Sequence, residues 1–278
     1  MQPKMNWTFM SLQILDDVRR GKLTFAEMFP RARAAGFVAY DASDSDAEFA
    51  PREEVLRLCA ENGLQIADYI HWVHLTTPDD AAFRAAVESG CRAARTALAH
   101  GTDKLMIVEN VAPEDLARMS REQAAARLAQ GLKRIVSAAA EYGVTVMVED
   151  FPSPLLPMCD SAEMRALLDG APGLKLVLDT GNTLARKEDP VAFAERFLGD
   201  FVHVHLKDIE YPENATTGDV DVDGRRMWNA QHGEGVVDFA KLLPMIEKTG
   251  YKGFVTVEYG PHEGTRDHFA KMAESIRY

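Results

Sequence analysis

Several carboxylate and imidazole side chains stand at the ends of short apolar runs, where together they could bind a divalent cation. They are Asp41, His71, Glu109, Glu149, Asp179, His205 and Glu258. Carboxylates held close together repel one another unless a proton or a cation neutralises them. The last four follow consecutive runs and would supply three carboxylates and one imidazole, a set suited to Mn²⁺, Mg²⁺ or Co²⁺. We therefore expect one divalent metal ion per chain, with Mn²⁺ favoured.

The elements that must position these side chains form a repeated unit of a helical stretch, a glycine and an apolar run. The runs are rich in β-branched residues and nearly continuous, as parallel strands buried on both faces require. They occupy residues 7–11, 37–41, 64–71, 104–109, 144–149, 174–179, 201–205 and 253–258. Helical composition marks residues 51–61, 81–100, 121–142, 161–168, 190–198, 239–248 and 265–277. Capping boxes at Thr24/Glu27 and Ser120/Gln123 mark two helix starts.

Eight strands that alternate with helices predict an α/β fold, namely a closed (β/α)8 TIM barrel. An open doubly wound sheet could use the same units, but no Gly-x-Gly-x-x-Gly turn follows an early strand. The 278 residues match one barrel of about 250 residues, so we predict a single domain over residues 1–278. Residues 209–236, rich in Gly and Asp, are expected to form a long loop or lid. Active sites of such barrels lie where the C-terminal strand ends meet, so the strand-end side chains should converge.

Five segments, in order along the chain, resemble the xylose isomerase-like TIM barrel superfamily of sugar phosphate isomerases and epimerases. They are Val-Glu at 148–149, Leu-Asp-Thr-Gly-Asn at 178–182, His-Val-His-Leu-Lys-Asp at 203–208, Gly-Glu-Gly-Val-Val-Asp-Phe at 233–239 and Val-Glu at 257–258. The superfamily also includes inosose dehydratase, 3-dehydroshikimate dehydratase, hydroxypyruvate isomerase, ketose 3-epimerases and endonuclease IV. The resemblance implies that the metal ligands are Glu149, Asp179, His205 and Glu258. It also implies that Glu149 and Glu258 form the catalytic acid/base pair.

The implied chemistry is proton transfer next to a carbonyl. A metal that chelates the carbonyl and a neighbouring hydroxyl oxygen stabilises the enediolate formed when the α-proton leaves. One carboxylate removes the proton, and the other returns it to the opposite face (epimerisation) or to the adjacent carbon (isomerisation). We therefore expect a divalent-metal-dependent sugar isomerase or epimerase. Loss of a β-hydroxyl from the same intermediate makes a dehydratase of an inosose-like or 3-dehydroshikimate-like substrate the alternative.

Further polar side chains are candidates for substrate binding. They are His71, Glu109, Asn182, Lys207 and Arg225. Lys207 lies one strand period beyond His205, and Arg225 in the 209–236 loop could hold a carboxylate or phosphate. Core packing, a salt bridge or plain solvation is the competing interpretation of each. Asn182 stands where endonuclease IV and the known ketose 3-epimerases tend to carry histidine, which argues against a three-metal phosphodiesterase and weakens the 3-epimerase assignment.

Composition limits the partners. Lys and Arg number 31 against 43 Asp and Glu, a net charge of −12, and no basic cluster suited to nucleic acid or an anionic membrane is present. No apolar run approaches the roughly 18 residues of a membrane span. The chain has three cysteines, Cys59, Cys91 and Cys159, an odd number without the spacing of a metal site. This pattern is typical of free thiols in a reducing cytoplasm. We expect a cytoplasmic enzyme for a small sugar, polyol or hydroxy-acid, and the family resemblance implies a homo-dimer or homo-tetramer.

Overall fold

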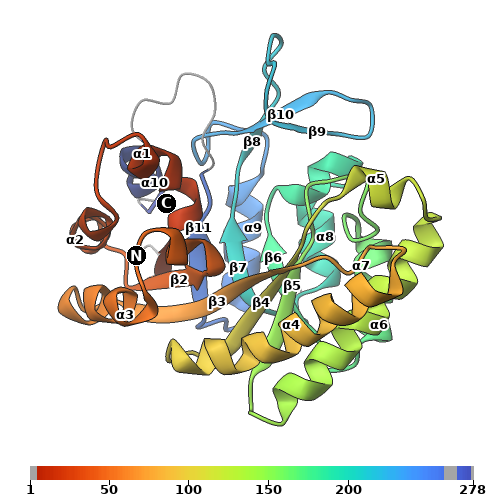
Figure 1. Ribbon diagram of the computed structural model, residues 1–278. Helices are drawn as coiled ribbons and strands as arrows, with labels where there is room; N and C mark the ends of the chain where they lie inside the picture. Colours follow the sequence, from red (N-terminus) through yellow and green to blue (C-terminus); the bar gives the residue numbers. More distant parts are fainter. Residues whose placement is uncertain (1–4, 260–267, 277–278) are drawn as a thin grey trace.

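The computed structural model describes residues 5–259 and 268–276 and contains a closed barrel of eight parallel strands (Figure 1). Around the barrel the strands follow the order β1-β11-β7-β6-β5-β4-β3-β2. They are β1 (Asn6–Met10), β2 (Ala39–Ser43), β3 (Gln65–Val73), β4 (Lys104–Glu109), β5 (Thr145–Glu149), β6 (Lys175–Asp179), β7 (Phe201–Leu206) and β11 (Phe254–Val257). The predicted barrel is confirmed, and each strand end lies within two residues of its predicted position.

Helices cover the outside of the barrel (Figure 1). They are α1 (Leu15–Arg19), α2 (Phe25–Ala35), α3 (Arg52–Glu61), α4 (Asp80–Ala99), α5 (Pro113–Leu116), α6 (Arg121–Ala140), α7 (Ser161–Gly170), α8 (Pro190–Arg196), α9 (Phe239–Lys248) and α10 (His268–Ser275), with short 3-10 helices η1 (Ser11–Gln13), η2 (Asp44–Glu48) and η3 (Asn182–Arg186). Both predicted capping boxes are present. The ends of the helix predicted over residues 265–277 lie outside the described residues. None of the helices within the described residues is long and apolar enough to cross a membrane.

The interior of the barrel has an apolar half and a polar half. Side chains on each strand alternate between the interior and the surrounding helices. The apolar half consists of Met10, Ile70, Met106, Val108, Met147 and Val177. The polar half consists of Thr8, Asp41, Asp68, His203 and Thr256, all fully buried. This polar half lies on β1, β2, β3, β7 and β11, which are neighbours around the barrel.

The segment between β7 and α9 is a small antiparallel sheet rather than the irregular loop expected over residues 209–236. It comprises β8 (Ile209–Glu210), β10 (Arg226–Asn229) and β9 (Asp219–Val220), in that order, and it projects beyond the end of β7 (Figure 1). Asp208 anchors its base by accepting hydrogen bonds from the backbone N–H groups of Gly233 and Gly235, at 2.8 and 2.9 Å. A Cβ at position 235 would lie 2.2 Å from Oδ1 of Asp208, so only glycine fits at this position without displacing its neighbours. Movement of this segment as a lid stays a prediction.

Candidate active site

Four side chains from neighbouring strands meet at the C-terminal end of the barrel. Glu149 ends β5, Asp179 ends β6 and His205 lies in β7. Glu258 directly follows β11, where its backbone N–H still donates to the carbonyl of Leu206. One possible ligand atom from each of the four lies within 4.8 Å of the others. The strand order β5-β6-β7-β11 places the two glutamates at the outer ends of the set, with the aspartate and the histidine between them.

His205 connects the two glutamates. Its Nδ1 lies 3.2 Å from Oε2 of Glu149 and 3.2 Å from Oε2 of Glu258. Burial disfavours the charged imidazole, but the hydrogen bonds with these two carboxylates hold the pKa of His205 well above its ordinary value. The other ring nitrogen, Nε2, is buried and has no hydrogen-bond partner among the described residues. Nδ1 is therefore the nitrogen that faces the acidic cluster.

Asp179 presents to the cluster one oxygen that accepts no hydrogen bond within the described residues. Its Oδ1 accepts hydrogen bonds from the backbone N–H groups of Gly181 and Asn182, both at 2.7 Å, while Oδ2 is buried without a hydrogen-bond partner in the described part of the chain. Burial raises the pKa of Asp179 to about 7, although the charge of Lys207 opposes the shift. A fixed carboxylate with one oxygen that accepts no hydrogen bond, beside two more carboxylates and an imidazole, fits the donor set that a hard divalent cation takes.

Lys207 reaches the same cluster. Its Nζ lies 2.5 Å from Oε1 of Glu258 and 3.7 Å from Oδ2 of Asp179. Although burial disfavours its charge, these carboxylates raise the pKa of Lys207 above its ordinary value. Burial alone would also raise the pKa of Glu258, but Lys207 and His205 lower it to about 2. Lys207 therefore supplies positive charge to the acidic site, and its expected contact with substrate stays a prediction.

Asn182 holds Lys207 in place. It is fully buried in η3, where its side-chain amide donates to the carbonyl of Asp150 at 2.7 Å. Its Oδ1 accepts a hydrogen bond from Nζ of Lys207, also at 2.7 Å. The amide thus links the loop after β5 to the end of β7. A direct substrate contact by Asn182, which the sequence suggested, stays a prediction.

The structure does not bring His71 and Glu109 into this cluster. His71 Nδ1 lies 2.7 Å from Oδ2 of Asp44, and its Nε2 lies 3.0 Å from Oγ of Ser89 in α4. It therefore points outward, because Ile70, the preceding residue of β3, faces the barrel interior. Glu109 accepts hydrogen bonds from the backbone of the loop after β3, at Leu75 and Thr76. These contacts give both side chains structural partners, and their expected contacts with substrate stay predictions.

Arg225 lies just before β10 of the antiparallel sheet, and its expected contact with substrate stays a prediction. Arg225 is exposed and stacks over the ring of Tyr211, with its Cζ 4.0 Å from the ring centroid. Desolvation raises the pKa of Asp219 in β9, the charge of Lys207 opposes this shift, and that of Glu258 adds to it. The sequence does not distinguish Asp219 from the other acidic residues of this segment.

Asp41 lies deeper than the strand-end pattern indicated. It was expected at the mouth, but it is fully buried inside the barrel. Its carboxylate accepts hydrogen bonds from the hydroxyls of Thr8 and Thr256. Burial raises its pKa to about 6. Asp41 belongs to the polar half of the interior, beneath the four clustered residues.

Comparison with known proteins agrees with this architecture. L-ribulose-5-phosphate 3-epimerase UlaE of Salmonella typhimurium is 28% identical over 233 residues, which cover 80% of this chain and 76% of that protein. Inosose dehydratase of Lacticaseibacillus casei is 24% identical over 157 residues, covering 55% of this chain and 52% of that protein. The crystal structure of IolI with a zinc atom superposes with a TM-score of 0.76 at 14% identity, covering 98% of this chain and 96% of that chain.

The match to a family extends over nearly the whole chain. The sequence model that describes the xylose isomerase-like TIM barrel matches residues 16–277. This range includes every strand of the closed barrel after β1 and all four clustered residues. The chain therefore belongs to the xylose isomerase-like TIM barrel family.

Proposed function

We propose that this protein is a divalent-metal-dependent isomerase or epimerase that moves a proton next to a carbonyl in a small polyhydroxylated substrate. The observation that carries the proposal is the position of Glu149 and Glu258 on either side of Asp179 and His205. Two carboxylates that approach one point from opposite sides suit a reaction in which one removes a proton and the other returns it. The epimerase relative UlaE supports this reaction class.

The side-chain exposures support a division of roles within the cluster. The side chains of Glu149 and Glu258 are 12% and 17% exposed, so a substrate in the mouth can touch them. The side chains of Asp179 and His205 are 0% and 1% exposed. They could therefore contact a small bound ion but not a substrate in the mouth of the barrel. We assign the acid/base role to the two glutamates on this basis.

All four residues would hold the cation, for which Mn²⁺ is our first choice and Mg²⁺ or Co²⁺ the alternatives. The IolI structure, which has the same fold, holds a bound zinc atom, and this supports a bound metal ion in the present protein. When bound, the cation would polarise the substrate's carbonyl and neighbouring hydroxyl and so stabilise the charge left by proton removal.

The remaining steps belong to the chain's own residues. Lys207 and His205 lower the pKa of Glu258 to about 2, so its carboxylate is ionised at neutral pH, which is the form that a proton acceptor requires. Lys207 holds this carboxylate in place at 2.5 Å. Glu149 would deliver a proton that it takes from solvent, from its own side of the site, and Glu258 would release the abstracted proton to solvent to complete the cycle. A keto-sugar, polyol or hydroxy-acid offers the adjacent oxygens and acidic C–H bond that this arrangement requires.

Dehydration is the second candidate. A β-hydroxyl that leaves after proton removal would turn the same site into that of a dehydratase, acting on an inosose-like or 3-dehydroshikimate-like ring. The inosose dehydratase relative supports it. The two candidates differ in product, because only dehydration releases water and forms a double bond.

The test is incubation of candidate ketoses and cyclic polyols with the Mn²⁺-loaded protein in D₂O, followed by NMR. Incorporation of deuterium next to the carbonyl with retention of all hydroxyls is expected for the isomerase or epimerase, and a new vinylic proton for the dehydratase. Glu149→Gln and Glu258→Gln should each lower turnover by at least about 10²-fold. Full turnover by both variants on the true substrate would contradict the assigned acid/base pair.

A matched control is available just before the same strand. Glu141 is exposed in the turn before β5, at the opposite end of the barrel from Glu149. Glu141→Gln should therefore retain full turnover. Metal analysis of the purified protein adds a second check, since about one ion per chain is expected and a cluster of three zinc ions would indicate a phosphodiesterase site instead.

A further inference from the structure

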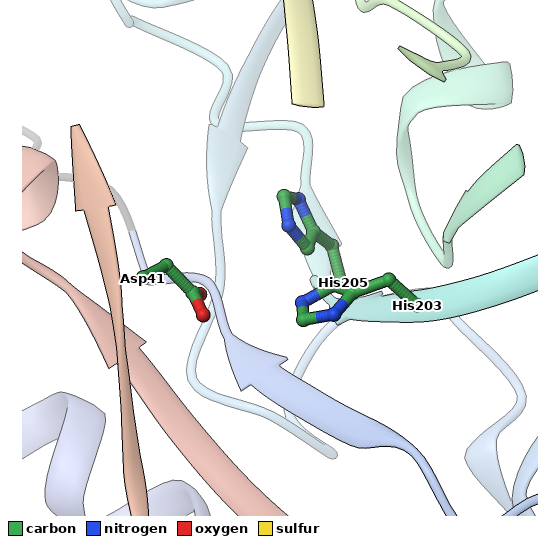
Figure 2. Close-up of side chains that lie close together, drawn as sticks. All are labelled: Asp41, His203 and His205. Atoms are coloured by element: carbon green, nitrogen blue, oxygen red, sulfur yellow. The ribbon is translucent and has the colours of Figure 1, made fainter. Parts of the chain in front are cut away.

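A second group of polar side chains lies directly beneath the proposed metal centre. Asp41 on β2 faces His203 on β7, and His205 lies above them (Figure 2). A carboxylate oxygen of Asp41 and one ring nitrogen of each histidine lie within 4.8 Å of one another. All three residues are at most 1% exposed. Because His205 belongs to both groups, this layer connects the metal centre to the barrel interior.

Asp41 is held rigidly by two neighbouring strands. The Thr8 hydroxyl on β1 donates to Oδ1 of Asp41 at 2.9 Å. The Thr256 hydroxyl on β11 donates to Oδ2 at 2.7 Å. Both threonines are fully buried, so water does not compete for these bonds. Each carboxylate oxygen keeps a further lone pair for another donor.

The hydrogen bonds of Thr256 determine the tautomer of His203. Nε2 of His203 lies 2.6 Å from the Thr256 hydroxyl oxygen. A hydroxyl carries one proton, and that of Thr256 goes to Asp41, so Nε2 of His203 must be the donor. In the neutral imidazole the other nitrogen, Nδ1, is then unprotonated and cannot donate to Asp41. His203 therefore leaves the free lone pairs of Asp41 to another donor.

His205 carries the donor that this carboxylate can accept. Its Nδ1 faces Glu149 and Glu258, and its Nε2 is buried without a hydrogen-bond partner among the described residues. A neutral imidazole that offers the Nδ1 lone pair to a cation carries its proton on Nε2. Metal-bound histidines usually donate that second N–H to a carboxylate or carbonyl, which fixes the orientation of the ring.

We propose that Asp41 is a positioning residue that accepts the Nε2–H of His205, directly or through one water, and thereby sets the ring for metal binding at Nδ1. This inference rests on the proposed metal centre. The same cluster offers the ligand atoms of a second cation site, but a cation at Nε2 together with one at Nδ1 would require an imidazolate, with no proton on either ring nitrogen. The positioning role needs only the ordinary neutral ring.

The test compares Asp41→Asn with Asp68→Asn in the affinity of the metal-stripped protein for Mn²⁺, measured by calorimetry. Asp68 is the matched control because it is the register partner of Asp41 on β3 and is equally buried, yet it does not belong to the cluster around His205. Asp41→Asn should weaken Mn²⁺ binding by about 10- to 100-fold. Asp68→Asn should change it less than about three-fold, and circular dichroism should show both variants folded.

A second measurement reports on the N–H itself. In the Co²⁺-loaded protein, the proton on a coordinated imidazole is shifted far from the other signals and exchanges with solvent deuterium. We expect one such protected signal in the wild type and in Asp68→Asn, and its loss or rapid exchange in Asp41→Asn. If Asp41→Asn does not fold, Thr8→Val, which removes one bond to Asp41, should accelerate this exchange.

The outcomes separate this inference from the proposed function. If the wild type binds no divalent cation, the metal centre itself is wrong. If the wild type binds one cation and Asp41→Asn binds it equally tightly with an unchanged N–H signal, the positioning role is wrong. Equal weakening by Asp68→Asn would indicate a general effect of buried charge, and a second bound ion lost in Asp41→Asn would indicate a cation site. Either result would also overturn the inference.

Discussion

Nζ of Lys207 lies 2.5 Å from Oε1 of Glu258, so one of the two proposed acid/base carboxylates is paired with a buried ammonium. The same ammonium lies 3.7 Å from Oδ2 of Asp179. A lysine in this position partly balances the negative charge that the strand ends bring together. It also explains why the pKa of Glu258 is lowered to about 2 in a buried site.

Removal of this ammonium should destabilise the metal-free protein. Lys207→Met leaves the buried carboxylates of Glu258 and Asp179 without a cation, which costs about 3–5 kcal/mol when one partner of a buried pair is lost. Urea unfolding in the presence of a chelator measures the change. Lys241→Met is the control, since Lys241 forms an exposed pair with Asp238 and its loss should change the unfolding free energy far less. Equal effects of the two variants would contradict the buried charge pair.

Metal binding should stabilise the wild type and fail to stabilise Asp179→Asn. A ligand at 100 times its dissociation constant adds about 2.7 kcal/mol to the free energy of unfolding. Asp179→Asn removes the charge of a proposed ligand, so added Mn²⁺ should leave its thermal transition nearly unchanged.

The metal-free state should respond differently to Asp179→Asn. The pKa of Asp179 is raised from 3.8 to about 7, so its stabilising contribution is present below pH 3.8 and is lost as the pH rises through 7. The metal-free variant at pH 8 should therefore be no less stable than the wild type. A large loss of stability there would show that Asp179 serves the fold more than the cation.

His74 should make the stability depend on pH in the alkaline range. Glu109 and Asp115 raise the pKa of His74 from 6.5 to about 9. The stabilisation is therefore fully present below pH 6.5 and disappears as the pH rises through 9. Because the side chain is 28% exposed, we expect only about 1–2 kcal/mol. The difference in unfolding free energy between the wild type and His74→Gln should shrink from pH 6 to pH 10, and a constant difference would argue against this charge.

A methyl group at Gly235 should disrupt the base of the antiparallel sheet. The new Cβ would lie 2.2 Å from Oδ1 of Asp208 and 2.5 Å from the carbonyl oxygen of Ile209. Gly235→Ala should cost about 1–3 kcal/mol, as overpacking does elsewhere. Gly199→Ala is the control, because nothing lies within 4 Å of its Cβ position and its φ is not positive. Thermal unfolding compares the two, and equal transition temperatures would contradict the anchoring role of Asp208.

The sequence alone was sufficient to predict the barrel and the four clustered residues. Each strand is a short β-branched run closed by a polar residue, and in a parallel barrel all such ends meet at one mouth. Glu149, Asp179 and His205 were therefore recognisable from local pattern, and Glu258 from the same pattern one residue beyond its strand. No knowledge of side-chain packing was required for this part.

The direction in which a single strand side chain points could be determined only from the tertiary structure. A strand buried on both faces has no polar alternation, so the sequence does not show that His71 points toward α4. Likewise, the carboxylate of Glu109 accepts hydrogen bonds from the backbone N–H groups of Leu75 and Thr76, which lie 34 and 33 residues earlier in the chain. Such partners are set by three-dimensional proximity, which local periodicity does not encode.

The same limit applies to the charges at the site. Lys207 looked like a side chain that extends from the mouth, but the neighbouring strands bring Glu258 and Asp179 within its reach. Asp41 looked like a mouth residue, but its bond to Thr256 joins positions 215 residues apart and holds it inside the barrel. The sequence determined which residues end the strands. Closure of the barrel decided which of them touch, because only closure makes β1 and β11 neighbours.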